Sequence, residues 1–284
     1  MNPRGRWHPW AMLAPTLALL TVFFLVPLGV AAYDSAFAWD MLTPARYVGA
    51  TNYVALARHG ALLGIALRTL GYSAMVVAGT TASGLGLAIL LHRDGAFFAF
   101  VRTCVFSAYV VSWVAVALLW MWILDGDGGV VGRLTSIPLL GDPRWALPTL
   151  AFVGTWKLAG YAMVVFSAGL QALPPSLLEA AALDGAGPLA RLRHVILPAL
   201  APTTAFVATT SLATSFQAFD AVRIMTQGGP ANATQLFVYA IYEEIFLDLR
   251  VGRASALTVV FFVLLCVLTG AQLALWRTRE AGAR

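Results

Sequence analysis

Polar side chains interrupt two of the long apolar runs of this chain, and their types suit hydrogen bonding to a solute. The residues are Trp156, Lys157 and Tyr161 in the run 147–173, and Ser211, Thr214, Ser215, Gln217 and Asp220 in the run 200–222. Hydroxyls, an amide and aromatic planes match a polyol, which presents hydrogen-bonding edges and apolar ring faces. We therefore predict that these residues line a cavity for such a solute.

The spacing in the second run supports a shared face, but it also permits a purely structural role. The stripe comprises Ser211, Thr214, Ser215 and Ala218. These residues stand at i, i+3, i+4 and i+7, which is one side of a helix. Serine and threonine side chains also join helices to one another inside membranes. The stripe is therefore compatible with two roles, lining a cavity and joining neighbouring helices.

Three charged residues raise a second alternative. If Lys157 and Arg223 both faced the cavity, they would favour a phosphorylated or otherwise anionic solute. Alternatively, Lys157 and Asp220 lie near the outer ends of their helices and pair there or extend towards water. A neutral and an anionic solute are therefore both compatible with the sequence.

The elements that position these residues are membrane-spanning helices. Hydrophobic residues make up 60% of the chain and charged residues 11%, well below the roughly 25% charge of a soluble domain. Crossing a bilayer takes a helix of about 20 residues. Six apolar runs reach that length: 11–33, 62–91, 97–124, 147–173, 200–222 and 254–276. We expect an all-α polytopic membrane protein with six transmembrane helices.

The first of these helices is expected to stay in the mature protein. Arg4 and Arg6 precede it, but the run 11–33 is longer than the core of a signal peptide, and no convincing cleavage site follows. Basic residues in short tails and turns favour a cytoplasmic location for both termini. We predict a multi-pass protein of the plasma membrane.

A polar, cationic segment, residues 179–198, separates the fourth and fifth apolar runs. Prolines and glycines bound a short helix at 179–183, namely Pro174, Pro175, Gly185, Gly187 and Pro198. Such a helix would lie at the cytoplasmic surface and offer a small apolar face to a partner. An ordinary loop between helices would have the same composition.

The order of residues in this segment carries a resemblance. Glu179, Ala180 and Ala181 are followed by Asp184, Gly185 and Ala186, and then by Leu197 and Pro198. This string resembles the EAA motif of binding-protein-dependent ABC importer permeases. The resemblance implies a type I permease fold with a coupling helix at 177–190 that docks on an ATP-binding subunit.

A second stretch points to the sugar type within that family. Thr226 to Pro230, with Ala233, Thr234, Tyr239, Tyr242 and Phe246 after it, is similar to the extracytoplasmic segment of the maltose and glycerol-3-phosphate type. Two positions depart from these relatives, which often carry Asn at position 68 and Pro at position 108, where this chain has Arg68 and Ala108. The first departure puts any shared ligand contact at position 68 in doubt.

The resemblance implies a function and a set of partners. The chain would be the transmembrane subunit of an importer that moves a di- or oligosaccharide, or a related polyol, by alternating access. Glycerol-3-phosphate and glycerophosphodiesters remain alternatives. The partners would be a second homologous permease subunit, two ATP-binding subunits, an extracytoplasmic solute-binding protein and the lipid bilayer.

The implied division of the chain has three parts. Residues 1–59 would form an amino-terminal tail, the first helix and an outer loop, residues 60–276 a five-helix permease core, and residues 277–284 a cytoplasmic tail.

Several other classes of protein lack support in the sequence. No G-x-x-x-x-G-K-[ST] stretch is present, so we expect ATP and Mg to bind a partner ATPase and no cofactor to bind this chain. Cys104 and Cys266 fall inside predicted helices, and no cluster has metal-ligand spacing. Scattered basic residues argue against a nucleic-acid partner, and dispersed histidines against a catalytic site. A stand-alone channel or secondary carrier remains a rival, although no filter or inverted repeat is evident.

Overall fold

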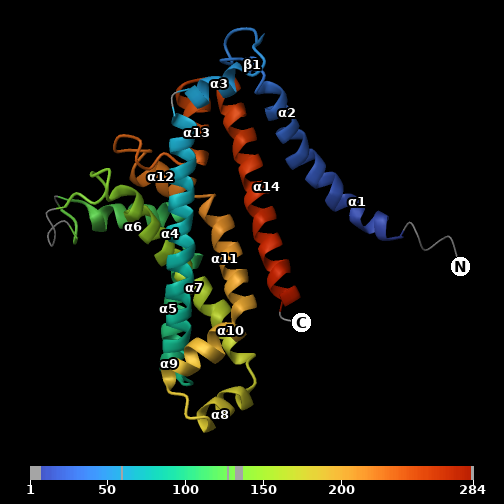
Figure 1. Ribbon diagram of the computed structural model, residues 1–284. Coiled ribbons are helices and arrows are strands. Elements are labelled where there is room, and N and C mark those ends of the chain that lie inside the picture. Colours follow the sequence, from blue (N-terminus) through green and yellow to red (C-terminus); the bar gives the residue numbers. More distant parts are fainter. Residues whose placement is uncertain (1–7, 59, 127, 132–136, 283–284) are drawn as a thin grey trace, which may run out of the picture. The chain divides into compact units, whose positions relative to one another are not determined.

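The long apolar runs form helices in the computed structural model, which describes residues 8–58, 60–126, 128–131 and 137–282 (Figure 1). The chain divides into two compact units. Unit 1 comprises residues 1–64 and 240–284, and unit 2 comprises residues 65–239. Helix α13 (Phe237–Tyr242) carries the chain from unit 2 back into unit 1.

Unit 2 is built from helices that follow one another with short breaks. They are α4 (Ala61–Leu90, which enters the unit at Ile65), α5 (Ala96–Val110), α6 (Trp113–Leu124), α7 (Ala146–Gln171), α8 (Pro175–Leu183), α9 (Pro188–Arg191), a π-helical turn (Leu192–Ile196), α10 (Leu197–Ala199), α11 (Ala201–Ser215) and α12 (Phe219–Met225). Helix α7 packs against α5, α6, α11 and α12.

Small residues let the helices of unit 2 approach closely. A Cβ atom added to Gly84 of α4 would collide with the Cβ of Ala162 on α7, and one added to Gly160 of α7 would collide with the carbonyl oxygen of Val105 on α5. Membrane helices pack through such contacts because lipid tails are as apolar as leucine side chains. The core next to these contacts is apolar and includes Met163, Phe166, Leu200 and Val207.

Unit 1 joins the two ends of the chain. Its elements are α1 (His8–Leu20), a π-helical turn (Thr21–Leu25), α2 (Val26–Asp34), β1 (Phe37–Ala38), β2 (Arg46–Tyr47), α3 (Thr51–Arg58), a second π-helical turn (Glu243–Leu247) and α14 (Val251–Gly282). The antiparallel pair β1 and β2 is an addition to the all-α fold that we expected. Helix α14 packs on α2, and the ring of its Phe262 meets that of Phe24, in the preceding π-helical turn, edge to face at 6.5 Å.

Four stretches of the described residues are long and apolar enough to cross a membrane, and six are if two bent pairs each count as one span. The four are Met12–Asp34, Ala61–Leu90, Ala146–Gln171 and Val251–Gln272. The bent pairs are α5 with α6, at 102°, and Pro188–Ala199 with α11, at 68°. A mostly helical, multi-span chain is therefore confirmed.

Two of the predicted continuous helices are wrong in detail. The predicted helix 97–124 is broken because Val111 and Ser112 take extended backbone angles, with ψ of 142° and 141°. The predicted helix 200–222 ends at Ser215 and resumes at Phe219, since Ala218 has a ψ of 44°. The second break also separates Ala218 from the helical stripe to which its spacing assigned it.

Candidate functional site

The break between α5 and α6 is held by one buried cation. Lys157 is the twelfth of the 26 residues of α7, which places it near the middle of that helix, and its side chain is 4% exposed. Its Nζ atom donates hydrogen bonds to the carbonyl oxygens of Ala108 at 3.3 Å, Tyr109 at 3.1 Å and Val111. The same atom lies 5.1 Å from the centre of the Trp113 ring. Lys157 therefore binds the carboxyl-terminal end of α5, where a helix has unpaired carbonyls and a negative dipole end.

One turn further along α7, a cavity of about 280 Å³ opens between α5, α7 and α11. Its lining is Tyr109, Leu158, Tyr161, Thr210, Ser211, Ala213 and Thr214. The rings of Tyr109 and Tyr161 stack with their centres 5.1 Å apart. The hydroxyls of Thr210 and Thr214 donate to carbonyls of their own helix, whereas the Oγ of Ser211 is buried and makes no hydrogen bond.

Three of the eight residues predicted to line a cavity lie together in this lining, namely Tyr161, Ser211 and Thr214. Trp156 instead packs edge to face against Trp120 at 5.5 Å. Ser215 is buried and donates to the carbonyl of Leu212.

The remaining predicted residues lie elsewhere. Gln217 is exposed between α11 and α12, and Asp220 is half-buried in the first turn of α12. Lys157 is turned towards the helix break. The cavity lining thus carries no ionised group.

Tyr109 and Thr210 line the cavity although sequence reasoning missed both. Tyr109 belongs to a stretch that was predicted as one continuous apolar helix, so its place at a helix end had no signal in the hydropathy. Relatives often have proline where Ala108 stands, and that difference was the one available hint of a break. Thr210 stands next to the predicted stripe, at the position before Ser211.

The segment 175–198 is exposed and ends its first helix in a defined cap. The N–H of Gly185 donates to the carbonyl of Ala182, and the N–H of Ala186 donates to the carbonyl of Ala181 at 2.9 Å. These two bonds form a Schellman motif, which requires a left-handed residue at Gly185, where φ is +77°. Glycine adopts this conformation without strain. The Asp-Gly-Ala part of the segment is therefore explained by the helix cap.

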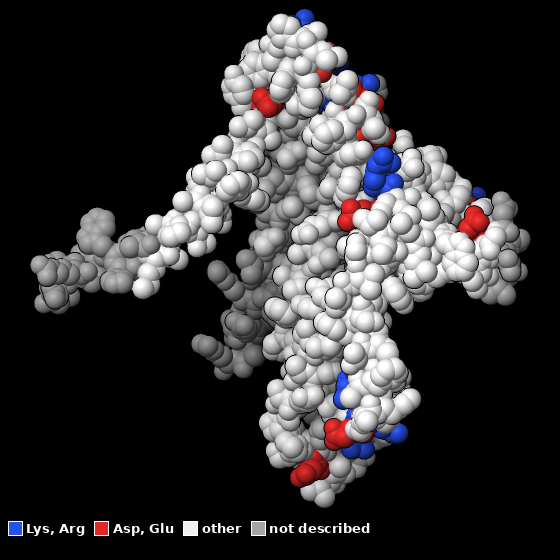
Figure 2. All heavy atoms as spheres, turned by 180° about the vertical axis from the view of Figure 1, so that it is seen from behind, with Lys and Arg blue, Asp and Glu red and all other residues white. Residues whose placement is uncertain are grey.

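Exposed apolar side chains stand among charges in this segment. Leu183 is 90% exposed and Leu189 is 77% exposed. Exposed charges here are Glu179, Asp184 and Arg193. Figure 2 shows acidic and basic side chains gathered at the end of unit 2 that carries α8, whereas broad areas of the helices are uncharged. Ala180 is exposed, while Ala181 and Ala186 are half-buried.

The loop after α12 is tied to the start of α4. The N–H of Phe237 donates to the Oγ1 of Thr69 at 3.1 Å, and the Nε of Arg68 donates to the carbonyl of Gln235 at 3.3 Å. Gly228 has a φ of +79°, and an added Cβ would lie 2.7 Å from the ring of Tyr239. The backbone turns at residues 226–228, and Arg68 holds this loop.

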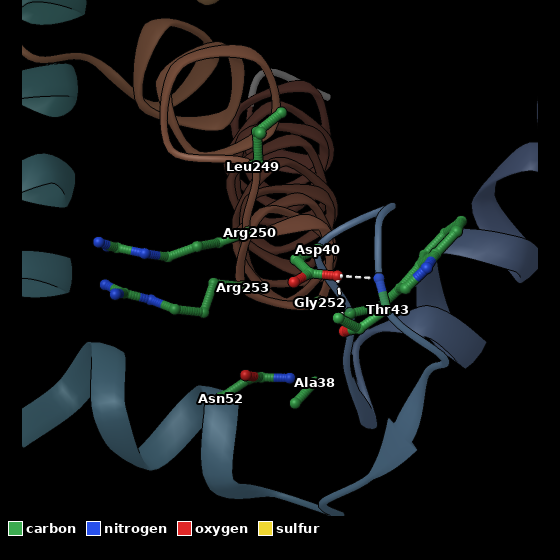
Figure 3. Close-up of a pocket in the computed structure, with 9 residues that line it drawn as sticks. Ala38, Asp40, Thr43, Asn52, Leu249, Arg250, Gly252 and Arg253 are labelled. Carbon is green, nitrogen blue, oxygen red and sulfur yellow. Dashed lines mark hydrogen bonds between the residues drawn. The ribbon is translucent and has the colours of Figure 1, made fainter.

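Unit 1 contains a separate pocket of about 310 Å³ where the turn after β1, α3 and the start of α14 meet (Figure 3). Asn52 donates from Nδ2 to the carbonyls of Ser35 at 2.8 Å and Phe37 at 2.9 Å. Asp40 accepts hydrogen bonds from the backbone N–H and the hydroxyl of Thr43, and these bonds lower the pKa of the Asp40 carboxyl.

The two arginines of this pocket are already paired. Arg253 lies 3.0 Å from the Oε1 of Glu244, and Arg250 lies 3.2 Å from the Oδ2 of Asp248. Burial raises the pKa of the Glu244 carboxyl, and the charges of Arg253 and Arg250 act in the opposite direction. Both arginines of the pocket are therefore paired with carboxylates that lie outside its lining.

Metal chemistry finds no support in the described residues. No group of three or more His, Cys, Asp or Glu side chains is placed to hold a metal ion in that part of the chain. Cys104 and Cys266 are free and exposed on helices.

Comparison with known proteins identifies relatives over nearly the whole chain. The sn-glycerol-3-phosphate transport system permease protein UgpA of Salmonella choleraesuis is 31% identical over 281 residues, covering 95% of this chain and 94% of its own. UgpA of Agrobacterium fabrum is 32% identical over 276 residues, covering 93% and 92%.

Solved structures share the fold. A chain of a bacterial ABC transporter involved in the import of the acidic polysaccharide alginate matches with a TM-score of 0.80 at 22% identity, covering 96% of both chains. A chain of the inward-facing MetNI methionine ABC transporter matches with a TM-score of 0.59 at 18% identity, covering 76% of this chain and 95% of the other.

The family profile described as "Binding-protein-dependent transport system inner membrane component" matches residues 79–278. This match and the curated relatives confirm the resemblance that the segment 179–198 suggested. The chain belongs to the binding-protein-dependent transport system inner-membrane components, the permease subunits of ABC importers.

Proposed function

We propose that this permease subunit imports a carbohydrate or a related polyol across the plasma membrane by alternating access. The observation that carries the solute class is the uncharged cavity of unit 2, with its stacked tyrosines and its three hydroxyl residues on α11. Aromatic planes accept the apolar faces of a sugar ring, and hydroxyls bind its edges. The Oγ of Ser211 is buried and makes no hydrogen bond in the structure, so its hydrogen-bonding capacity is unused there.

The cavity is small for a complete transport site. Ligand pockets usually measure about 300–1,000 Å³, and this one measures about 280 Å³. A second, homologous permease subunit would supply the facing wall. The pathway would then lie between the two subunits, with α5, α7 and α11 of this chain on one side.

Six spans with both termini in the cytoplasm fit this role. Each bent pair would supply one span, with α11 as the membrane-crossing part of the second pair, so the segment 175–198 would face the cytoplasm and residues 226–250 the outside. The parts 1–59, 60–276 and 277–284 remain our proposed division into first helix with outer loop, permease core and cytoplasmic tail. An extracytoplasmic solute-binding protein would deliver solute near 223–250.

The coupling helix at 177–190 would dock on one of two ATP-binding subunits, which would hold ATP and Mg. Exposed Leu183 and Leu189 offer apolar anchors, and Glu179 and Asp184 offer polar contacts around them. Burial of apolar side chains at the centre of an interface with charges at its rim is typical of protein contacts. This arrangement would let closure of the ATPase pull on α8.

Charge reversal at Glu179 tests the docking. In the complex expressed with its partner subunits, Glu179→Lys should lower solute uptake and solute-stimulated ATP hydrolysis at least about tenfold, the loss expected for a like-charge contact costing about 1.4 kcal/mol or more. The amount of protein in the membrane should not change. Asp94→Lys makes the same charge change on an exposed carboxylate outside the segment and should retain uptake. Normal uptake by the Glu179 variant would contradict the docking.

Substitution of one cavity hydroxyl tests the solute site. Thr214→Val keeps the shape of the side chain, removes its hydroxyl, and should raise the Km for solute about two- to tenfold, the range expected for one hydrogen bond. Thr209→Val is the matched control, because Thr209 lies on the same helix, bonds its own backbone and stays outside the cavity lining. Equal Km values for both variants would reject the cavity as the solute site.

Glycerol-3-phosphate is a second candidate because the curated relatives transport it. Against it stands the lining, which lacks a cation in this subunit. Competition of sn-glycerol-3-phosphate and of maltose against uptake of the native solute separates the two classes. Competition by the phosphate ester alone would favour the second candidate.

A further inference from the structure

We propose that Lys157 is a positioning residue of the transport pathway, which holds the α5–α6 break and so sets Tyr109 in the cavity wall. This inference rests on the proposed role of the cavity. It differs from the anion-binding role that the sequence allowed, since the ammonium group is directed at backbone carbonyls and Lys157 is not among the lining residues.

The break between α5 and α6 leaves carbonyl groups that α5 itself does not bind. A helix that ends inside a membrane leaves carbonyl groups that lipid cannot bind, and each needs a donor from the protein or from water in a cavity. The carbonyls of Ala108, Tyr109 and Val111 all accept from Lys157, whose ammonium group has three protons to donate. One side chain thus binds two carbonyls of the last turn of α5 and the carbonyl of the following residue, Val111.

Two residues of α7 contact Tyr109 of α5. Lys157 and Tyr161 are four residues apart, so they lie on the same face of the helix. Lys157 binds the carbonyl of Tyr109, and Tyr161 stacks on the ring of Tyr109. Helix α7 therefore contacts both the backbone and the side chain of Tyr109 on α5.

A close approach of α5 and α7 at Gly160 allows both contacts. Gly160 lies between the two gripping residues in sequence, and a Cβ there would collide with the carbonyl of Val105. The two helices approach closely enough for Lys157 to reach the break because position 160 has no side chain. Removal of the Lys157 side chain should therefore change the position of Tyr109 in the cavity wall and leave α11 unchanged.

Thiol labelling tests the inference without a known solute. In a Cys104→Ser, Cys266→Ser background, Tyr109→Cys reports on the wall of the break and Thr210→Cys reports on α11, which Lys157 does not contact. A water-soluble cationic methanethiosulfonate reagent is applied to the assembled complex. Lys157→Met should change the labelling rate at position 109 at least about fivefold and leave the rate at position 210 within about twofold, because the opening is local.

The possible results separate this inference from the proposed function. If position 109 is not labelled with Lys157 present, the cavity does not reach water there and both proposals fail. If it is labelled and Lys157→Met leaves the rate unchanged, only the positioning role fails. Equal changes at 109 and 210 would indicate general loosening and would also overturn it. Should Lys157→Met not accumulate, Lys157→Gln, which keeps two donors without a charge, is measured by the same criteria.

Discussion

Two helix breaks in unit 2 are stabilised in opposite ways. At Val111–Ser112, inside an apolar span, the free carbonyls of α5 are bound by the side chain of Lys157 from another helix. At Asp184–Gly187, in an exposed segment, the end of α8 is capped by its own backbone through the left-handed Gly185. The first break needs a partner far away in the sequence, whereas the second is encoded locally.

The end of α4 is capped by a side chain from the next helix, so its cap is intermediate between a distant and a local one. The Nη1 of Arg102 on α5 donates to the carbonyls of Leu91 at 2.6 Å and Arg93 at 3.1 Å, just after the end of α4. Leu91 is buried, whereas Arg93 is exposed. The three helix ends thus differ in their surroundings, from the polar segment at Gly185 through the turn at 91–93 to the break at 111–112, which lies within an apolar bent pair of helices. The free energy lost with each cap should increase in the same order, because unpaired carbonyls are costly only where water cannot replace the donor.

The largest effect is expected at the contact that brings Lys157 to its break. Gly160→Val should push α5 away from α7, since even a Cβ meets the backbone of Val105 and Phe106. Overpacking alone costs about 1–3 kcal/mol, and the grip of Lys157 would be lost in addition. We expect little folded protein by size-exclusion chromatography in detergent. Gly86→Val adds the same side chain to α4, where nothing lies within 4 Å, and should accumulate normally. Normal behaviour of the Gly160 variant would contradict the close approach.

The next effect compares the two basic caps. Lys157→Met should lower the free energy of unfolding by about 3 kcal/mol or more, because three carbonyls within an apolar bent pair of helices lose their donor. Arg102→Met should lower it by only about 1 kcal/mol, since water reaches part of its site. Thermal midpoints of the purified complex in detergent measure both. If Arg102→Met lost more unfolding free energy than Lys157→Met, access to water would be rejected as the cause of the difference between the two sites.

The smallest effect is expected at the exposed break. Gly185→Ser places a side chain at positive φ, which costs about 1–2 kcal/mol, whereas Gly187→Ser places serine at an amino-terminal cap, where it is favoured. The thermal midpoint of the complex should hardly change. Trypsin should cut at Arg191 and Arg193 about fivefold faster in the first variant only, as expected for a local loss of about 1 kcal/mol. Equal cutting of the two variants would refute the capping role of Gly185.

The helices of this fold could be predicted from sequence because hydropathy and length decide them. The runs 62–91 and 147–173 agree with α4 and α7 within two residues at each end. The break at Val111 could not be predicted in this way, since the residues around it are as apolar as those of a continuous helix. Its stabilising partner is 46 residues away from it in the sequence.

Some features of the candidate site could likewise be predicted from local sequence, whereas others depend on tertiary packing. The cap at Gly185 and the turn at Gly228 could be predicted because glycine at positive φ is a local signal. Tyr161, Ser211 and Thr214 were found from residue type and spacing. Tyr109 and the orientation of Lys157 depend on tertiary packing, and a buried lysine in sequence gives no sign of whether it faces a solute or a helix end.

Photocross-linking from the exposed segment tests the central claim most directly. Leu189→p-benzoylphenylalanine is introduced into the chain expressed with its partner subunits, and adducts are identified by mass spectrometry after illumination. Leu67→p-benzoylphenylalanine, at an exposed site on α4, is the matched control. The account predicts an adduct with an ATP-binding subunit from position 189 and none from position 67. An intact complex in which position 189 gives no such adduct would contradict it.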